Sequence, residues 1–276
     1  MRTRLVLVIL LVWFLAIVVA FTHYQFRGFE QANPFGDYVL SALAVLVAVV
    51  VATALGLRVL APERPRPRDA VLGLAVGLAI LAIAALALAA AKMLRPYVIW
   101  PAMVAAGALS YRQVVTLASL IRAFRLRQLT AVEGVLIGLL SLAGLIVLAN
   151  CLAPLTANDA LVYHLNLPKI YARASGLVQM PHLVYANMPH YGEMLYALFY
   201  VLAGETGAKL AYLVLMAGAA LAVYVLARRF APRSLALGVA AIFLVEPLVL
   251  DSRIVCNVDV LLTYCYIVAI TLVLES

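Results

Sequence analysis

Residues 70–91 read AVLGLAVGLAILAIAALALAAA and contain no charged side chain. A helix needs about 20 mostly apolar residues to cross the hydrocarbon core of a bilayer, so this stretch is long enough to span one. Comparable apolar runs recur along the chain, at residues 5–22, 38–60, 97–121, 131–152, 207–227, 235–250 and 258–274. The sequence therefore predicts an all-α fold, a polytopic transmembrane helical bundle with about eight spanning helices.

The composition excludes a soluble enzyme. Hydrophobic residues make up 67% of the 276 residues and charged residues only 12%, and the mean hydropathy is +1.10. Soluble domains are about half apolar and about one-quarter charged. The net charge of +8 does not indicate a nucleic-acid partner, because the basic residues form short clusters between apolar runs, as in a membrane protein.

The placement of lysine and arginine predicts the orientation. Cytoplasmic loops of membrane proteins carry an excess of these residues. With the N-terminus in the cytoplasm, thirteen of the 20 basic residues fall on the inner side: Arg2, Arg4, Arg58, Arg64, Arg66, Arg68, Arg112, Arg122, Arg125, Arg127, Arg228, Arg229 and Arg233. We therefore expect a multi-pass protein of the plasma (inner) membrane with a cytoplasmic N-terminus.

Two of the runs carry polar signals. Arg112 interrupts the run at 97–121, which makes it the weakest span, and its side chain is expected to extend to one membrane face. Thr130 and Glu133 form a capping-box pattern just before the run at 131–152, so a helix should begin there. We divide the chain into N-terminal transmembrane helices at 1–130 and a second part at 131–276.

One segment, residues 153–206, is longer than the other connections and falls on the outer side. A helix is expected from about 158 to 176, because Gly176 is a typical C-terminal stop. A second apolar stretch, at 190–203, is too short to cross the bilayer. We therefore predict two interfacial helices on a long outer loop.

The first of these helices is the most polar part of the chain. On a regular helix Asp159, Tyr163 and Asn166 share one face, and Lys169 and Arg173 lie four residues apart. A carboxylate, a phenol and two cations would then gather at the outer membrane surface. The alternative is that Asn158 or Asp159 only caps the helix while the cations bind lipid headgroups.

A second polar cluster, residues 251–259, should lie on the same outer side, next to Glu246. Asn257 is expected to cap the last helix and to leave Asp259 in its first turn. Acids at the membrane edge are functional candidates, although a solvated turn would explain them too. We predict that Asp159 and Asp259 flank one cavity, with Arg253 or Lys169 on its rim.

Histidine and cysteine give no metal motif. The spacings of His164, His182 and His190 match no standard ligand pattern, so no bound metal is expected. A lone divalent cation between Asp159 and Asp259 stays possible. The three cysteines show no disulfide or metal spacing and are expected to be packing residues: Cys151, Cys256 and Cys265.

The order of these features resembles a known family. An outer loop with an early Asp159 is followed by Tyr163-His164, a basic helix end, Asn187-Met188-Pro189, Gly204, the segment YVLARRF at 224–230, and Asp259 at the start of another helix. This is similar to the N-terminal half of the GT-C membrane glycosyltransferases, in the protein O-mannosyltransferase and aminoarabinose transferase branch. The resemblance covers about 131–276, and Asn158 stands where the family often carries a second acid.

The resemblance implies a function. Asp159 would act on the acceptor as a base or metal ligand, Asp259 would support the site, and the donor would be a sugar linked to a polyprenyl phosphate. The donor phosphate needs cations, and the available side chains are Lys169, Arg173 and Arg253, with Tyr163 and His164 beside them. No cofactor is expected apart from the possible divalent cation.

Two other classes of function stay open. A transporter or channel should carry polar or broken helices near the middle of the bilayer, whereas the spanning runs here consist mainly of Ala, Leu and Val. A non-catalytic membrane scaffold would not need Asp159 and Asp259 to converge in space.

Overall fold

The computed structural model describes residues 34–123, 128–156, 158–188, 190–246 and 256–275, and every regular element in these ranges is helical. The prediction of an all-α protein is confirmed there. The elements are α2 (Pro34–Leu60), α3 (Pro67–Ala90), α4 (Pro96–Leu109), α5 (Tyr111–Ala123), α6 (Ala131–Leu152), the π turn η1 (Ala160–His164), α7 (Asn166–Ala174), the 3₁₀ turn η2 (Val184–Asn187), α8 (Tyr191–Ala227), α9 (Arg233–Val245) and α11 (Asp259–Val273).

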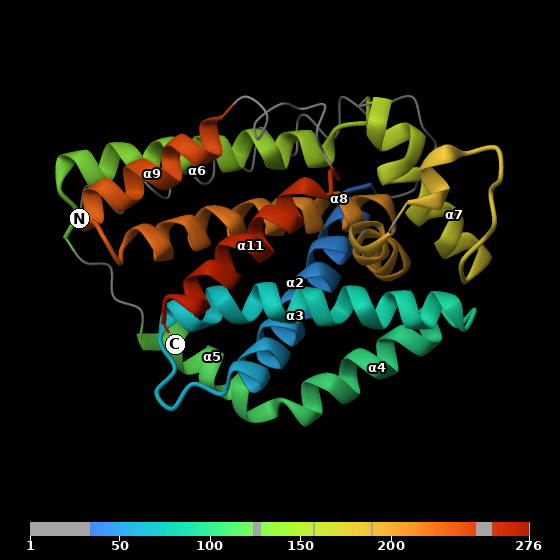
Figure 1. Cartoon of the computed structure of the whole chain (residues 1–276), viewed down its shortest axis with the longest axis horizontal. Coiled ribbons are helices and arrows are strands. Elements are labelled where there is room, and N and C mark those ends of the chain that lie inside the picture. Colours follow the sequence, from blue (N-terminus) through green and yellow to red (C-terminus); the bar gives the residue numbers. More distant parts are fainter. Residues whose placement is uncertain (1–33, 124–127, 157, 189, 247–255, 276) are drawn as a thin grey trace.

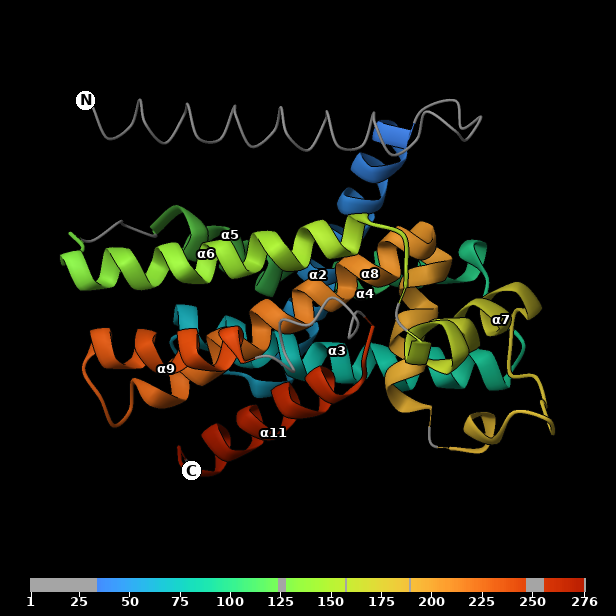
Figure 2. The ribbon, with the colours of Figure 1, turned by 90° about the horizontal axis from the view of Figure 1, so that it is seen from above.

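The helix α8 is the centre of the bundle. It packs against α2, α3, α6, α7, α9 and α11, and Figure 2 shows it between α6 and α11. In Figure 1, α3, α6 and the second half of α8 run along the long axis. The segments η1, α7 and η2 lie at one end, which we call the loop end. At the opposite end α3 begins and α8 ends. Five arginines lie there, Arg64, Arg66, Arg68, Arg228 and Arg229, and we call it the arginine end.

The described residues form fewer long helices than the roughly eight spanning helices that the sequence predicts. By length and composition α2, α3, α6 and α8 could each cross a membrane, and the bent pair α4–α5 could be a fifth span. The helices α9 and α11 are apolar but only 13 and 15 residues long. The run at 5–22 and the end of the run at 235–250 lie outside the described residues. The described part is therefore a helical membrane protein with four or five candidate spans.

The predicted span at 97–121 is wrong as a single straight helix. The chain bends by 74° between α4 and α5, and Arg58 donates a hydrogen bond to the carbonyl oxygen of Leu109 at the bend. The polar residues of α5 recur on one face, at Arg112, Thr116, Ser119 and Arg122. A charged side chain in the middle of a span is costly, and the bend lets α5 avoid this position.

Small residues set the closest helix contact. A Cβ atom added to Gly77 of α3 would lie 1.7 Å from the carbonyl oxygen of Ala52 in α2, and one added to Gly56 would lie 1.8 Å from the oxygen of Gly73. Gly73 and Gly77 form a G-x-x-x-G pattern, which lets helix backbones approach closely in a membrane. The backbones of α2 and α3 therefore pack closely through their small residues.

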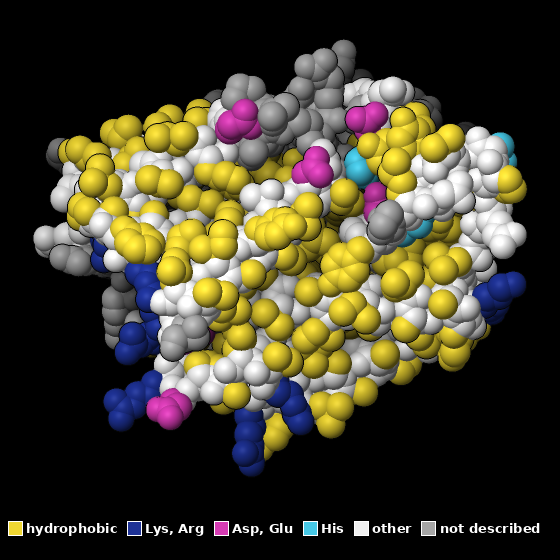
Figure 3. All heavy atoms as spheres, in the orientation of Figure 1, with side chains coloured by type: hydrophobic (Ala, Val, Ile, Leu, Met, Phe, Trp, Pro, Cys, Tyr) yellow, Lys and Arg dark blue, Asp and Glu magenta, His cyan; other side chains and the backbone are white. Residues whose placement is uncertain are grey.

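The outer surface of the helices is apolar. Side chains of α6 such as Val132, Val135, Leu139 and Leu142 are exposed, and Figure 3 shows hydrophobic side chains over most of the visible face, with Lys and Arg at its edges. Monomeric soluble proteins rarely expose so large an apolar surface. This surface is suited to contact with lipid chains.

Several helix boundaries predicted near and within residues 131–276 are confirmed. The Thr130 Oγ1 accepts from the Glu133 N–H at 3.3 Å, and Glu133 Oε2 accepts from the Thr130 N–H at 3.0 Å, so the capping box is present. The helix predicted near 158–176 ends at Ala174, followed by Ser175 at a φ of 59°. Non-helical backbone at Ala203 and Gly204 divides α8 into two parts, as the sequence pattern of a short helix followed by a span predicts.

Candidate functional site

The site is built where the starts of α8 and α11 meet. Tyr196 Oη donates to the carbonyl oxygen of Asn257 at 2.8 Å. A Cβ atom added to Gly192 would lie 2.4 Å from Val258 Cγ1, so glycine allows the two helix starts to touch. These contacts fix the position of Asp259, the first residue of α11. Its N–H donates to Asn257 Oδ1 at 2.9 Å. Asp259 lies in the first turn as predicted, but the N-cap position of α11 is Val258 and not the predicted Asn257.

A buried pair joins η1 to the start of α8. His164 Nδ1 lies 3.0 Å from Glu193 Oε1, and the two residues are only 7% and 6% exposed. His164 ends the π turn η1, in which the Leu165 N–H bonds to the carbonyl oxygen of Ala160. A π turn inserts one extra residue into a helix, and such turns are frequent at functional sites. Here the turn directs His164 inward to Glu193.

Tyr163 lies next to this pair and faces outward. Its ring stacks on Tyr185, with ring centroids 4.3 Å apart and an angle of 9° between the planes, and it contacts the His164 ring at 4.0 Å. Partial burial raises the pKa of the Tyr163 phenol, and the negative charges of Asp159, Glu193 and Asp259 raise it further. One phenol therefore lies within electrostatic reach of three carboxylates from three segments of the chain.

Asp159 and Asp259 are both exposed. They are 100 positions apart in the sequence, and the negative charge of each raises the pKa of Tyr163. The Glu193 carboxylate, in contrast, is paired with the His164 ring. The exposed carboxylates are hydrogen-bond acceptors and possible proton acceptors at neutral pH. This end of the bundle thus carries two exposed carboxylates and an aromatic stack formed by Tyr163 and Tyr185.

In the described part of the chain, neither Lys169 nor Arg173 forms an ion pair with Asp159 or Asp259. Lys169 lines a cavity of about 220 Å³ with Ala160, Asn166 and Glu205, and Arg173 is exposed in the last turn of α7. Arg253 lies outside the described residues. The amide of Asn166 donates to the Val162 carbonyl oxygen at 3.4 Å. Asn166 therefore lines the cavity with Lys169, while Tyr163 packs on Tyr185.

A larger cavity adjoins this one. It measures about 930 Å³ and is lined by apolar residues including Leu40, Trp100 and Leu152, with Glu205 and Lys209 at its polar side. Lys209 is 5% exposed; its Nζ donates to the Ala153 carbonyl oxygen at 2.8 Å and lies 3.4 Å from Glu205 Oε1. The two cavities share Pro154 and Glu205 as lining residues.

Sequence reasoning missed Glu193, Tyr185 and the Glu205–Lys209 pair as parts of the site. The pair was readable, because an acid and a base four residues apart interrupt an otherwise apolar run. Glu193 was visible as an acid in the apolar stretch at 190–203. Only the fold reveals that it faces His164.

No metal site is formed by the described residues, since no three His, Cys, Asp or Glu side chains among them are placed to hold an ion. His182 is exposed, and His190 Nε2 lies 2.9 Å from the Ala186 carbonyl oxygen. The side chains of His164, His182 and His190 therefore have different surroundings: His164 pairs with Glu193, His182 is exposed, and His190 contacts a backbone carbonyl oxygen.

Comparisons with models of protein families, with curated proteins and with solved structures find no match to this chain.

Proposed function

We propose that the protein is a membrane glycosyltransferase that moves a sugar from a polyprenyl phosphate donor to an acceptor on the outer face of the membrane. The observations that support the proposal are that Asp159 and Asp259 are both exposed and that the negative charge of each raises the pKa of the same phenol, Tyr163. Asp159 precedes η1 and Asp259 begins α11, so both acids belong to the loop end of the bundle. Ionisable residues at a membrane boundary are functional candidates.

In the proposed reaction, Asp159 accepts the proton of the acceptor hydroxyl while that oxygen bonds to the anomeric carbon of the sugar. The bond between this carbon and the phosphate oxygen breaks, and the polyprenyl phosphate leaves with the electron pair. General-base assistance of this kind is typically worth about 10²–10⁴ in rate. Asp259, whose N–H donates to Asn257 Oδ1, orients the acceptor.

The donor is accommodated by the two adjoining cavities. A polyprenyl chain is apolar, and the larger cavity has an apolar wall that includes Leu43, Val47 and Trp100. Lys209 in that cavity and Lys169 in the smaller one supply positive charge for the phosphate. The smaller cavity is lined by Ala160, the residue after Asp159, so a phosphate there would hold the sugar beside the proposed base.

The orientation follows from the two ends of the bundle. Arg66 and Arg229 belong to the arginine end, and Asp159 and His182 to the loop end. Because basic residues are enriched in cytoplasmic loops, we assign the arginine end to the cytoplasm and the loop end to the outer face of the plasma (inner) membrane. The GT-C resemblance of 131–276 is in accord with this assignment.

One observation favours a transporter instead. The helix α8 is broken at Ala203 and Gly204, and the buried Lys209 lies beside the large cavity near this break. Broken helices and buried charges are typical of substrate pathways in transporters. A transporter would move a solute across vesicles without consuming a sugar donor.

The test is donor consumption by membranes that contain the full protein, using a panel of radiolabelled polyprenyl phosphosugars. We expect one donor to be consumed and its label to appear in an acceptor, and the Asp159→Asn variant to be inactive at equal expression. Uptake of labelled solute without donor consumption would support the transporter. Absence of both activities across the panel would leave a scaffold as the better description and would overturn the proposal.

A further inference from the structure

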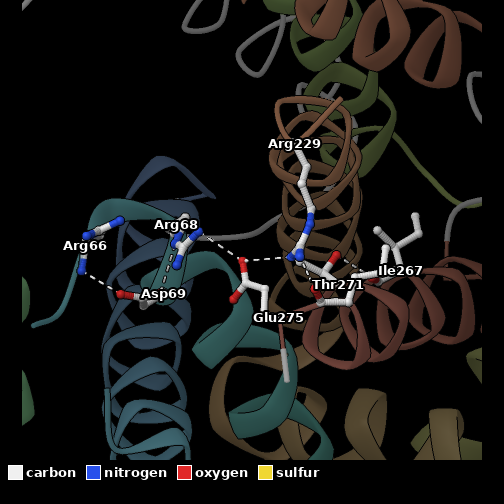
Figure 4. A network of polar contacts seen from close by, with 8 residues as sticks. Arg66, Arg68, Asp69, Arg229, Ile267, Thr271 and Glu275 are labelled. Atoms are coloured by element: carbon white, nitrogen blue, oxygen red, sulfur yellow. Dashed lines mark hydrogen bonds and ion pairs between the residues drawn. The ribbon is translucent and has the colours of Figure 1, made fainter. Parts of the chain in front are cut away.

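A polar network closes the arginine end of the bundle (Figure 4). Arg68 at the start of α3 places Nη1 3.0 Å from Glu275 Oε1, and Arg229 after α8 places Nη1 3.8 Å from the same oxygen. Glu275 follows α11. A single carboxylate oxygen is therefore shared by guanidinium groups from two other helices, and three helix ends meet at it.

Two cavities lie on either side of this network. One, of about 430 Å³, is lined by Arg64, Arg66 and Arg68 and by the apolar side chains of Leu60, Leu72 and Leu272. The other, of about 280 Å³, is lined by Arg68, Arg228, Arg229, Tyr224, Thr271 and Glu275. Arg68 and Glu275 line both, so the ion pair between them forms the wall that separates the two spaces.

The charges around these cavities are not balanced. Five arginines line them, and the acids are Glu63, Asp69 and Glu275. Asp69 is already engaged, since Oδ2 accepts from the Arg66 N–H at 2.7 Å and Oδ1 lies 3.5 Å from Arg68 Nε. Among the described residues, the guanidinium groups of Arg64, Arg66 and Arg228 have no ion pair.

Arginine side chains in this arrangement suit a phosphate group. A guanidinium presents several N–H donors in a fixed plane and binds phosphate oxygens in pairs. Clusters of lysine and arginine next to the cytoplasmic ends of membrane helices attract anionic lipids, at about 1 kcal/mol per basic residue. The leucines beside the arginines provide an apolar wall that a free phosphate ion would not contact.

We infer that these cavities bind the headgroup phosphate of an anionic phospholipid, which replaces the Glu275 carboxylate at Arg68. The phosphate bonds to Arg64, Arg66 and Arg68, and the first methylene groups of the lipid contact the partly exposed Leu60 and Leu272. Glu275 holds the site closed until lipid binds. This site lies at the opposite ends of α8 and α11 from Asp159 and Asp259, and it is independent of the proposed sugar transfer.

The test uses the full chain purified in a neutral detergent. Phosphatidylglycerol, phosphatidylcholine or inorganic phosphate is added, and lipid retention is measured by native mass spectrometry. We expect phosphatidylglycerol to be retained and phosphatidylcholine not. The double variant Arg64→Gln/Arg66→Gln should bind phosphatidylglycerol at least about tenfold more weakly, as expected for loss of a charge-assisted hydrogen bond. These side chains have no ion pair in the described structure, so the variant should fold.

Two further variants make the result specific. Arg122→Gln, which removes an exposed arginine of α5 away from both cavities, should bind the lipid as the wild type does. Glu275→Gln should bind it more tightly, because the competing carboxylate is lost. Equal retention of the two lipids, unchanged binding by the double variant, or weaker binding by Glu275→Gln would overturn the inference. Competition by millimolar inorganic phosphate as effective as by the lipid would replace the lipid with a soluble phosphate ligand.

Discussion

The two ends of the bundle share α8 and α11 but are built in different ways. At the loop end the backbone is irregular, with the π turn at Ala160–His164, the 3₁₀ turn at Val184–Asn187 and the break at Gly204. At the arginine end the helices stop at short connections, and Arg68, Arg229 and Glu275 form ion pairs. Irregular backbone is used where side chains must be directed at each other. Under the proposals above, the irregular loop end carries the chemistry and the arginine end binds the lipid headgroup.

The largest effect should come from Asp159 at the loop end. Asp159→Asn keeps the volume of the side chain and can still cap a helix, so a purely structural role predicts little change. If Asp159 is the base, sugar transfer should fall by about 10²–10⁴. The measurement is the initial rate of transfer from the radiolabelled donor in membranes.

Asp159→Glu is the matched variant. It keeps the carboxylate but displaces it, and a misplacement of about 1 Å can cost about 10²-fold. A rate for Asp159→Asn equal to the wild-type rate, at equal expression, would show that Asp159 is not the base and that the loop end has no special chemical role there.

The second effect compares carboxylates at the two ends. Glu193→Leu leaves the buried His164 without its partner and should lower the free energy of unfolding by about 3 kcal/mol. Glu275→Leu removes a partly exposed ion pair and should cost less than about 1 kcal/mol. Thermal unfolding in detergent, followed by the loss of soluble protein, measures both. Equal destabilisation by the two variants would contradict the contrast between a buried and an open network.

A third, smaller effect on stability should come from the contact between α2 and α3, which lies between the two ends. Gly77→Ala would place a Cβ atom 1.7 Å from the Ala52 carbonyl oxygen, so α2 and α3 must separate, at a cost of about 1–3 kcal/mol. Gly138→Ala on α6 is the control, because no atom lies within 4 Å of its Cβ. Alanine favours a helix by up to about 1 kcal/mol over glycine. Destabilisation by the control alone would refute the close contact of α2 and α3.

The smallest effect concerns the pKa of Tyr163. The charges of Asp159 and Asp259 raise this pKa after burial does, so Asp159→Asn and Asp259→Asn should each lower it slightly. An acid whose pKa is raised on folding is stabilising below its unfolded pKa of about 10 and loses this contribution as pH rises through the folded value. Tyrosine titration by NMR, assigned with Tyr163→Phe, measures the shifts. If Asp259→Asn left the pKa of Tyr163 unchanged, Asp259 would not be close enough to Tyr163 to belong to the same site.

Much of the fold could be predicted because each helix carries its own signals. The apolar run at 70–91, the Thr130 cap and the stop at Gly204 depend on residues that are close in the sequence. The bend between α4 and α5 was missed. Arg112 marked the span as weak, but the polar residues Thr116, Ser119 and Arg122 were not interpreted as the sign of a separate amphipathic helix. The G-x-x-x-G pattern at Gly73 and Gly77 was readable and predicts a close contact.

The site could be predicted only in part. Asp159, Tyr163 and Asp259 were identified as polar residues near helix starts, but the role of His164 depends on the π turn that directs it to Glu193. Such a turn is decided by what it packs against, and local pattern does not reveal it. The burial of Lys209 could not be predicted from the sequence either, since it depends on the end of α6, where its Nζ donates to the Ala153 carbonyl oxygen.

The account depends most on the two ends facing opposite sides of the membrane. His182 at the loop end and Arg66 at the arginine end are both exposed, so a cysteine at either position can react. The measurement is labelling of His182→Cys and of Arg66→Cys with a membrane-impermeant maleimide on intact cells, in a background without the native cysteines. We expect position 182 to be labelled and position 66 to react only after the membrane is opened. Labelling of position 66 but not of 182 on intact cells would contradict the orientation and, with it, sugar transfer at the outer face.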